Sequence, residues 1–264
     1  MEIQPDLSVC LLHSTPGSAG LTGFLESLYT HADPVSFEAI IVANARDIDD
    51  LAEVEREFPG IVILENLAAD PLPKACNHAW RLAQGRYLSL WDESLRIRPN
   101  CLKNLIDFLE ETPEAGIIAP RIVTADGLVA ASARTTPGLA TLCFLHTGLS
   151  KVIPSGPHLR AHLLAEQDHL QNFEADWLLS EALVLRRDVL DEVGFLDEGF
   201  ARLYADADYC LRARRAGWHL HYLAEAVVSQ GSQPASPPAD SARILADCTR
   251  FLLKKWLRPA QLPA

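Results

Sequence analysis

The chain has 264 residues, of which 48% are apolar and 22% are charged, a composition that suits one large globular domain or at most two small ones. Lysine and arginine total 23 against 35 aspartate and glutamate residues, and the resulting formal net charge of −12 disfavours binding to a nucleic acid backbone. No stretch reaches the roughly 18 uninterrupted apolar residues of a membrane-spanning helix, and the N-terminus is acidic where a signal peptide would be basic.

The six cysteines form no C-x-x-C pair, and most of them lie in apolar stretches. Buried thiols in a reducing compartment are the simplest interpretation of this distribution. We therefore expect a soluble, cytoplasmic protein.

The first half of the chain alternates short apolar runs with segments of helical periodicity, which is typical of strands and helices around a mainly parallel sheet. Strands are predicted at residues 7–13, 37–43, 61–64 and 86–90. Helices are predicted at residues 21–29, 47–58, 71–84 and 99–111. Pro59 and Gly60 end the second of these helices, and Gly85 ends the third. The repeated pattern predicts an α/β fold.

The second half is less regular. Short strands are predicted at 116–120 and 127–131, joined by a tight turn at Asp126-Gly127. Residues 135–174 have no clear period and are predicted to be a variable insertion with some helix. An apolar run at 177–185, a helix ending at Val193, a helix at 205–216 and a strand at 218–223 follow. Residues 232–240 are rich in proline, serine and alanine and predict a mobile linker, and 241–257 predict an amphipathic helix.

Several blocks of the sequence occur in an order that belongs to a known family. The first block runs from Asn66 to Asp92, and the second runs from Trp177 to Gly217 and includes Tyr204-x-Asp206-x-Asp208 before Leu211-Arg212. Together these blocks resemble the family 2 glycosyltransferases, of the rhamnosyltransferase-like branch, over about residues 7–232. The metal and nucleotide motifs depart from the family pattern.

The resemblance implies a GT-A fold, which is a Rossmann-like, mainly parallel sheet flanked by helices. Residues 1–231 would form this domain, with a nucleotide-binding half at 1–120 and an acceptor half at 121–231, and residues 232–264 would form the linker and C-terminal helix. The implied activity is the transfer, with inversion, of a hexosyl or deoxyhexosyl unit. The donor would be a nucleotide sugar and the acceptor a saccharide or a lipid-linked saccharide.

Inverting transfer needs a carboxylate that takes the proton of the acceptor hydroxyl. In the family this base is the aspartate of a Glu-Asp pair just before a helix, and Asp206 matches it while Ala205 replaces the glutamate. The resemblance therefore implies that Asp206 is the catalytic base. Taken without the resemblance, Asp206 and Asp208 are acidic residues that stabilise the start of a helix.

A divalent cation such as Mn²⁺ or Mg²⁺ is the second expected component, because oxygen ligands can hold it against a diphosphate. The family places an acidic pair at the end of the fourth strand, where this sequence reads Trp91-Asp92-Glu93. Glu93 and Asp92 are thus the candidate metal ligands. Alternation along a strand would point them to opposite faces, and an acidic loop without metal is the equal alternative.

The donor is expected at the carboxyl ends of the first, second and fourth strands, where open α/β sheets bind their ligands. The candidate nucleotide-sugar-binding residues are Ser14, Thr15, Asn44, Asn77 and Asp92. The candidate acceptor-side residues are Trp177, Glu181 and Asp208.

Four positions depart from the family pattern, at Ala43, Trp91, Ala205 and Ser229. They favour the competing hypothesis, a non-catalytic relative that binds a sugar, a nucleotide or a partner enzyme. In the C-terminal helix, Lys254, Lys255 and Arg258 lie near Trp256 and could contact the inner face of an anionic membrane. A helix docked on the core is the alternative.

Overall fold

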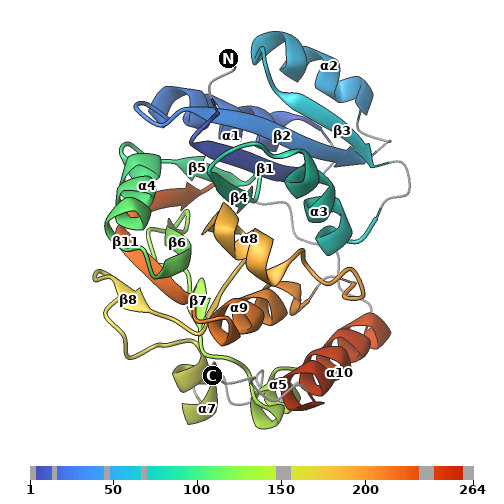
Figure 1. Cartoon of the computed structure of the whole chain (residues 1–264), viewed down its shortest axis with the longest axis vertical. Coiled ribbons are helices and arrows are strands. Elements are labelled where there is room, and N and C mark those ends of the chain that lie inside the picture. Colours follow the sequence, from blue (N-terminus) through green and yellow to red (C-terminus); the bar gives the residue numbers. More distant parts are fainter. Residues whose placement is uncertain are drawn as a thin grey trace.

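The computed structural model describes residues 4–13, 17–44, 48–66, 70–146, 156–201, 203–231 and 241–257 (Figure 1). The predicted α/β fold is confirmed: a large, twisted sheet lies between layers of helices. The helices are α1 (Ala19–His31), α2 (Ile48–Glu57), α3 (Leu72–Leu82), α4 (Cys101–Glu111), α5 (Leu139–His146), α7 (Pro157–His162), α8 (Arg187–Val193), α9 (Ala205–Arg215) and α10 (Ser241–Leu257).

Within the described residues, the main sheet has nine strands, and eight of them follow the order β3-β2-β1-β4-β10-β6-β11-β5, with β8 added beside β11. Strands β1 to β4 pair in parallel, whereas β10 is antiparallel to both of its neighbours. The strands are β1 (Leu7–His13), β2 (Phe37–Asn44), β3 (Val62–Asn66), β4 (Tyr87–Trp91), β5 (Leu95–Ile97), β6 (Ala115–Val123), β8 (Phe173–Glu174), β10 (Ala182–Arg186) and β11 (His219–Gln230). A separate two-stranded sheet joins β7 (Ala133–Arg134) to β9 (Trp177–Leu178).

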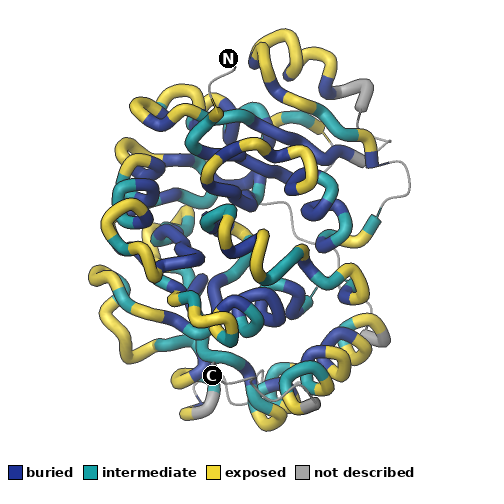
Figure 2. Tube along the Cα trace, viewed as in Figure 1, coloured by how far each residue is buried: buried dark blue, intermediate teal, exposed yellow. Residues whose placement is uncertain are grey.

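Apolar residues pack on both faces of the sheet, in two clusters. Alternate residues of β1 contribute to them in turn, with Cys10 in one cluster and Val9 and Leu11 in the other. The first cluster includes α3, α8, α9 and α10, and the second includes α1, α2 and α4. Figure 2 shows that the central strands are buried along their lengths. This double coverage explains why the parallel strands are nearly continuous apolar runs.

Gly85 marks a point of close approach between the end of the α3 segment and β1. Its amide donates a hydrogen bond to the Ser8 hydroxyl at 2.8 Å, and a Cβ at this position would lie 2.5 Å from the Ser8 backbone nitrogen. Any larger residue would therefore push β4 away from β1, because backbone atoms cannot give way as a side chain can.

Two predicted strands and one apolar run differ in the structure. Residues 127–131 form only an isolated bridge between Val123 and Val129, because a hydrogen bond from the Gly127 amide to the Thr124 carbonyl closes a tight turn. The strand predicted at 218–223 continues to Gln230, where β11 pairs with β5 and β6. The apolar run at 177–185 divides into β9 and β10, which belong to different sheets.

The C-terminal helix α10 is confirmed and packs on α9 with a buried face that includes Cys248 and Phe251. The carboxylate of Asp247 accepts hydrogen bonds from the Ala201 and Leu203 amides at 2.8 and 2.9 Å. Trp256, on the other face, is 72% exposed. The predicted mobile linker at 232–240 lies outside the described residues.

None of the described helices combines the length and the apolar character that crossing a lipid bilayer requires.

The main sheet carries strands from both predicted halves of the domain, and the boundary predicted at residue 120 falls within β6.

Candidate active site

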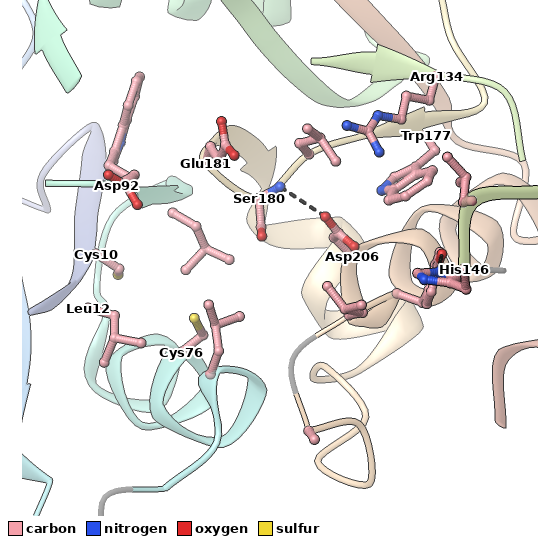
Figure 3. A pocket seen from close by; sticks show the side chains of 18 residues that line it. Cys10, Leu12, Cys76, Asp92, Arg134, His146, Trp177, Ser180, Glu181 and Asp206 are labelled. Atoms are coloured by element: carbon pink, nitrogen blue, oxygen red, sulfur yellow. Dashed lines mark hydrogen bonds between the residues drawn. The ribbon is translucent and has the colours of Figure 1, made fainter. Parts of the chain in front are cut away.

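A cavity of about 650 Å³ opens at the carboxyl ends of β1 and β4 (Figure 3). Leu12 from β1 and Asp92 after β4 line one side of it, together with Cys76 from α3. Residues of the second half of the chain, including Trp177 and Asp206, line the other side. The cavity therefore lies where open α/β sheets bind ligands, and residues of both predicted halves line it.

Asp206 faces this cavity from the first turn of α9. One carboxylate oxygen accepts a hydrogen bond from the Ser180 amide at 3.2 Å (Figure 3). The other accepts one from the Ala207 amide at 2.9 Å. Burial raises the pKa of Asp206, and these two amides and the charge of Arg134 only partly oppose that shift. A carboxylate with a raised pKa in a cavity is suited to accept a proton.

The start of α9 is held in an unusual backbone conformation. Tyr204, at the N-cap, has a φ of 63°, in the left-handed region that few bulky residues adopt. Its ring packs against Phe251 and Trp177, with ring centroids 5.6 and 5.8 Å apart, and its hydroxyl lies 2.6 Å from Nε2 of His146. These contacts fix the turn that aims Asp206 into the cavity.

Asp92 and Glu181 are neighbours at the junction of β4 and β10. The Asp92 amide donates a hydrogen bond to the Glu181 carbonyl at 2.8 Å. Burial, and secondly the charge of Asp92, raise the pKa of Glu181. One oxygen of Asp92 accepts hydrogen bonds from the amide and hydroxyl of Ser94, which orient this carboxylate in the cavity wall.

Glu93, the other candidate metal ligand, does not line the cavity. Its carboxylate lies 2.5 Å from Nδ1 of His13, and the glutamate side chain is only 6% exposed. The structure thus differs from the expectation that Glu93 and Asp92 hold a metal together, because the chain turns after β4 and separates the two carboxylates. The described residues contain no group of three or more histidine, cysteine, aspartate or glutamate side chains arranged to hold a metal.

Asn77 and Asp208, two further predicted site residues, make their contacts outside the cavity. The Asn77 amide exchanges hydrogen bonds with the backbone of Leu196 at 2.9 and 3.0 Å, which ties α3 to the loop after α8. Asp208 is buried between Arg212, at 2.9 Å, and Lys254 of α10, at 2.7 Å. Neither residue is among the described residues that line the cavity.

Of the remaining predicted site residues, Trp177 and Glu181 line the cavity. Ser14, Thr15 and the side chain of Asn44 lie outside the described residues, so their predicted roles stay predictions. At the departing positions, Ala43 and Ala205 are buried, and the Trp91 indole donates a hydrogen bond to the Ser89 hydroxyl at 2.7 Å.

Three further residues that line the cavity were not predicted from the sequence: Arg134, His146 and Ser180. His146 belongs to the segment at 135–174 that was predicted to be a variable insertion, and Arg134 comes directly before it. No periodicity there indicates which side chains turn inward. Ser180 lies in the break between β9 and β10, and with Glu181 it is the polar interruption of the apolar run at 177–185. A single arginine after the small residues Ala131, Ser132 and Ala133 was the available signal.

The chain is similar to several known proteins. Residues 18–177 match the family described as Glycosyl transferase family 2. The chain is 32% identical over 146 residues to N-acetylglucosaminyl-diphospho-decaprenol L-rhamnosyltransferase of Mycobacterium tuberculosis, over 52% of this chain and 46% of that protein. It is 22% identical over 204 residues to the low-salt glycan biosynthesis hexosyltransferase Agl10 of Haloferax volcanii, over 67% of this chain and 61% of that protein.

A solved structure, that of GalNAc-T7 with UDP, GalNAc and Mn²⁺, superposes with a TM-score of 0.64 at 14% identity, over 88% of this chain and 45% of that chain. At this identity the likeness shows the fold alone. The chain spans about half the length of the rhamnosyltransferase and about three fifths of the hexosyltransferase that it matches.

Proposed function

The chain belongs to glycosyl transferase family 2, and we propose that it moves a hexosyl or deoxyhexosyl unit from a nucleotide sugar to a saccharide or lipid-linked acceptor. The observation that carries this proposal is the position of Asp206, a carboxylate with a raised pKa in the wall of a large cavity. The similarity to a transferase whose name specifies a diphospho-decaprenol acceptor supports the lipid-linked class.

The proposed reaction is a single displacement. Asp206 takes the proton of an acceptor hydroxyl, the hydroxyl oxygen forms a bond to the anomeric carbon, and the bond from that carbon to the diphosphate breaks. The attack comes from the face opposite the leaving group, so the configuration inverts. The nucleoside diphosphate leaves with the bonding electron pair. Only one carboxylate has to accept a proton in this scheme.

The donor fits the part of the cavity beside Leu12 and Asp92, at the carboxyl ends of β1 and β4. A divalent cation, when bound, would neutralise charge on the diphosphate. Asp92 is the described residue that suits this role, because Mg²⁺ is commonly held by one or two carboxylates together with substrate phosphates. Glu93 does not suit it, since its carboxylate is directed to His13.

The competing function is a non-catalytic protein that binds a sugar, a nucleotide or a partner enzyme. The replacement of family polar residues by buried Ala43 and Ala205 favours it. The retained carboxylate at position 206, in the position that the chemistry needs, favours catalysis.

Thermal unfolding against a panel of nucleotide sugars tests donor binding. We expect at least one nucleotide sugar to raise the melting temperature, because a ligand at 100 times its Kd stabilises the folded state by about 2.7 kcal/mol. A full panel that leaves the melting temperature unchanged, with and without Mn²⁺ or Mg²⁺, would contradict donor binding. Binding without transfer or hydrolysis across a broad acceptor panel would favour the non-catalytic protein.

Metal binding should depend on Asp92 and not on Glu93. In calorimetric titrations with Mn²⁺ and a nucleoside diphosphate, Asp92→Asn should weaken the metal affinity by about tenfold or more, because a charged oxygen ligand is lost. Glu93→Gln is the matched control: it should leave that affinity within about twofold and instead lower the melting temperature, since it weakens the buried contact with His13 by removing the carboxylate charge. Loss of Mn²⁺ affinity in Glu93→Gln alone would restore Glu93 as the ligand.

A further inference from the structure

The charged side chains of the cavity are unevenly distributed. Three carboxylates, Asp92, Glu181 and Asp206, line it, and Arg134 is the one lysine or arginine among its described lining residues. Arg134 belongs to β7, and its guanidinium lies over the indole of Trp177, 5.1 Å from the ring centroid (Figure 3). The arginine is therefore held in place by stacking, which leaves the edge of its planar fork available.

The guanidinium of Arg134 has few partners in the described structure. Its Nε donates one long hydrogen bond, of 3.5 Å, to the Ala131 carbonyl. No carboxylate of a described residue lies within 4.0 Å of its nitrogens, although the charges of Asp206 and Glu181 act on it from farther away. Burial lowers the pKa of Arg134, yet arginine stays charged at neutral pH. Arg134 is partly buried in the cavity wall, so its terminal nitrogens are suited to a ligand oxyanion.

The position of Arg134 in the cavity indicates which of the two substrates, donor or acceptor, carries this oxyanion. Asp92, beside the proposed diphosphate position, acts on Glu181, and Glu181 in turn lies within range of Arg134 and Asp206. Figure 3 shows the same order, with Asp92 on one side of Glu181 and with Arg134 and Trp177 on the other, close to Asp206. Arg134 thus lies on the acceptor side of the base.

We infer that the acceptor carries an oxyanion, either a phosphate or a carboxylate, which Arg134 binds while Asp206 receives the hydroxyl proton. This inference rests on the proposed transferase function and specifies its acceptor class. A diphosphate in a lipid-linked acceptor and the carboxylate of a uronic acid are the two sources of this chemistry. Both present two oxygens to the guanidinium fork, and the bidentate contact would orient the acceptor hydroxyl.

Binding measurements with two probes test the inference. Farnesyl diphosphate represents a lipid diphosphate and methyl glucuronide represents a uronic acid, and each is titrated into the full chain in the presence of saturating UDP or dTDP, so that the donor position is filled. We expect one probe to bind and to lose about 10- to 100-fold in affinity in Arg134→Gln, which removes a charge-assisted bidentate contact. Arg134→Lys should recover only part of this loss, because lysine lacks the planar fork.

Arg214→Gln is the matched control. Arg214 pairs with Asp176 at 2.8 Å and is not among the described lining residues, so its substitution should leave both probe affinities within about twofold. Affinity for the nucleoside diphosphate itself should also be unchanged in Arg134→Gln. Melting curves of each variant establish that it is folded.

The outcomes separate the two proposals. Loss of farnesyl diphosphate binding in Arg134→Gln identifies a phosphate-bearing acceptor, and loss of methyl glucuronide binding identifies a carboxylate-bearing one. If Arg134→Gln weakens nucleoside diphosphate binding as much as probe binding, Arg134 serves the donor and the inference is wrong. If the wild type binds a nucleotide but neither probe depends on Arg134, only the acceptor inference fails. A wild type that binds no nucleotide overturns the proposed transferase function instead.

Discussion

Replacing Asp206 with asparagine should lower the rate of glycosyl transfer by about 100-fold or more, while donor affinity changes little. Asparagine has nearly the same shape and can still accept a hydrogen bond, but it cannot take a proton from the acceptor hydroxyl. The carboxylate lies in the cavity wall and accepts hydrogen bonds from the Ser180 and Ala207 amides. The single side-chain oxygen of asparagine keeps one of these two hydrogen bonds, so the substitution removes the base and leaves the shape of the site. Steady-state transfer rates and calorimetric donor affinities measure the two quantities separately.

The same variant should be more stable than the wild type at neutral pH. Because the folded-state pKa of Asp206 is raised, the folded protein binds more protons than the unfolded chain between the ordinary aspartate pKa and the raised value. Stability therefore falls as the pH rises through that window, and the ionised carboxylate is a cost above it. Asparagine resembles the protonated acid, so the gain in melting temperature should shrink as the pH is lowered. A variant that is less stable than the wild type at pH 7 would contradict this account.

Asp208→Asn, two residues along the same helix, should have the opposite effects: it should lower the stability of the fold and reduce transfer far less than Asp206→Asn does. The carboxylate of Asp208 is 2% exposed and pairs with Arg212 and with Lys254 of α10. Removing one partner of a buried ion pair typically costs about 3–5 kcal/mol. Because Lys254 keeps its 2.8 Å pair with Asp197 and is itself one-fifth exposed, we expect a loss of about 2–3 kcal/mol. The midpoint of urea unfolding measures this change.

Asp107→Asn provides the control for that loss. Asp107 pairs with Lys103 one turn earlier on α4, and both side chains are nearly half exposed, so its removal should change stability by less than about 0.5 kcal/mol. Transfer by Asp208→Asn should fall far less than transfer by Asp206→Asn. Equal, small effects of the two substitutions on transfer would remove Asp206 as the proposed base.

Part of the candidate site could be predicted from the sequence. Asp92, Trp177, Glu181 and Asp206 were predicted, and all four line the cavity. They follow strands or begin a helix, and the carboxyl ends of neighbouring strands meet at one edge of a sheet. Position in the chain was therefore enough to place these residues near a ligand.

The direction of a side chain could not be predicted in the same way. Asp92 and Glu93 are adjacent in sequence, yet one faces the cavity and the other lies against His13 from β1. Asp206 and Asp208 share the first turn of α9, but about 200° of helical rotation separates them, so Asp208 meets α10. Which of two neighbouring carboxylates faces the cavity depended on elements distant in the sequence.

The amino-acid sequence alone sets the class of fold, because the alternation of apolar periods is local and most predicted elements agree with the observed ones to within a few residues. Tertiary structure decided the composition of the cavity. The antiparallel strand β10 enters between β4 and β6 and leaves Ser180 and Glu181 at the end of β4. The pairing of β7 with β9 then brings Arg134 over Trp177. These contacts join residues more than 40 positions apart, and their energies depend on burial and charge that exist only once the chain has folded.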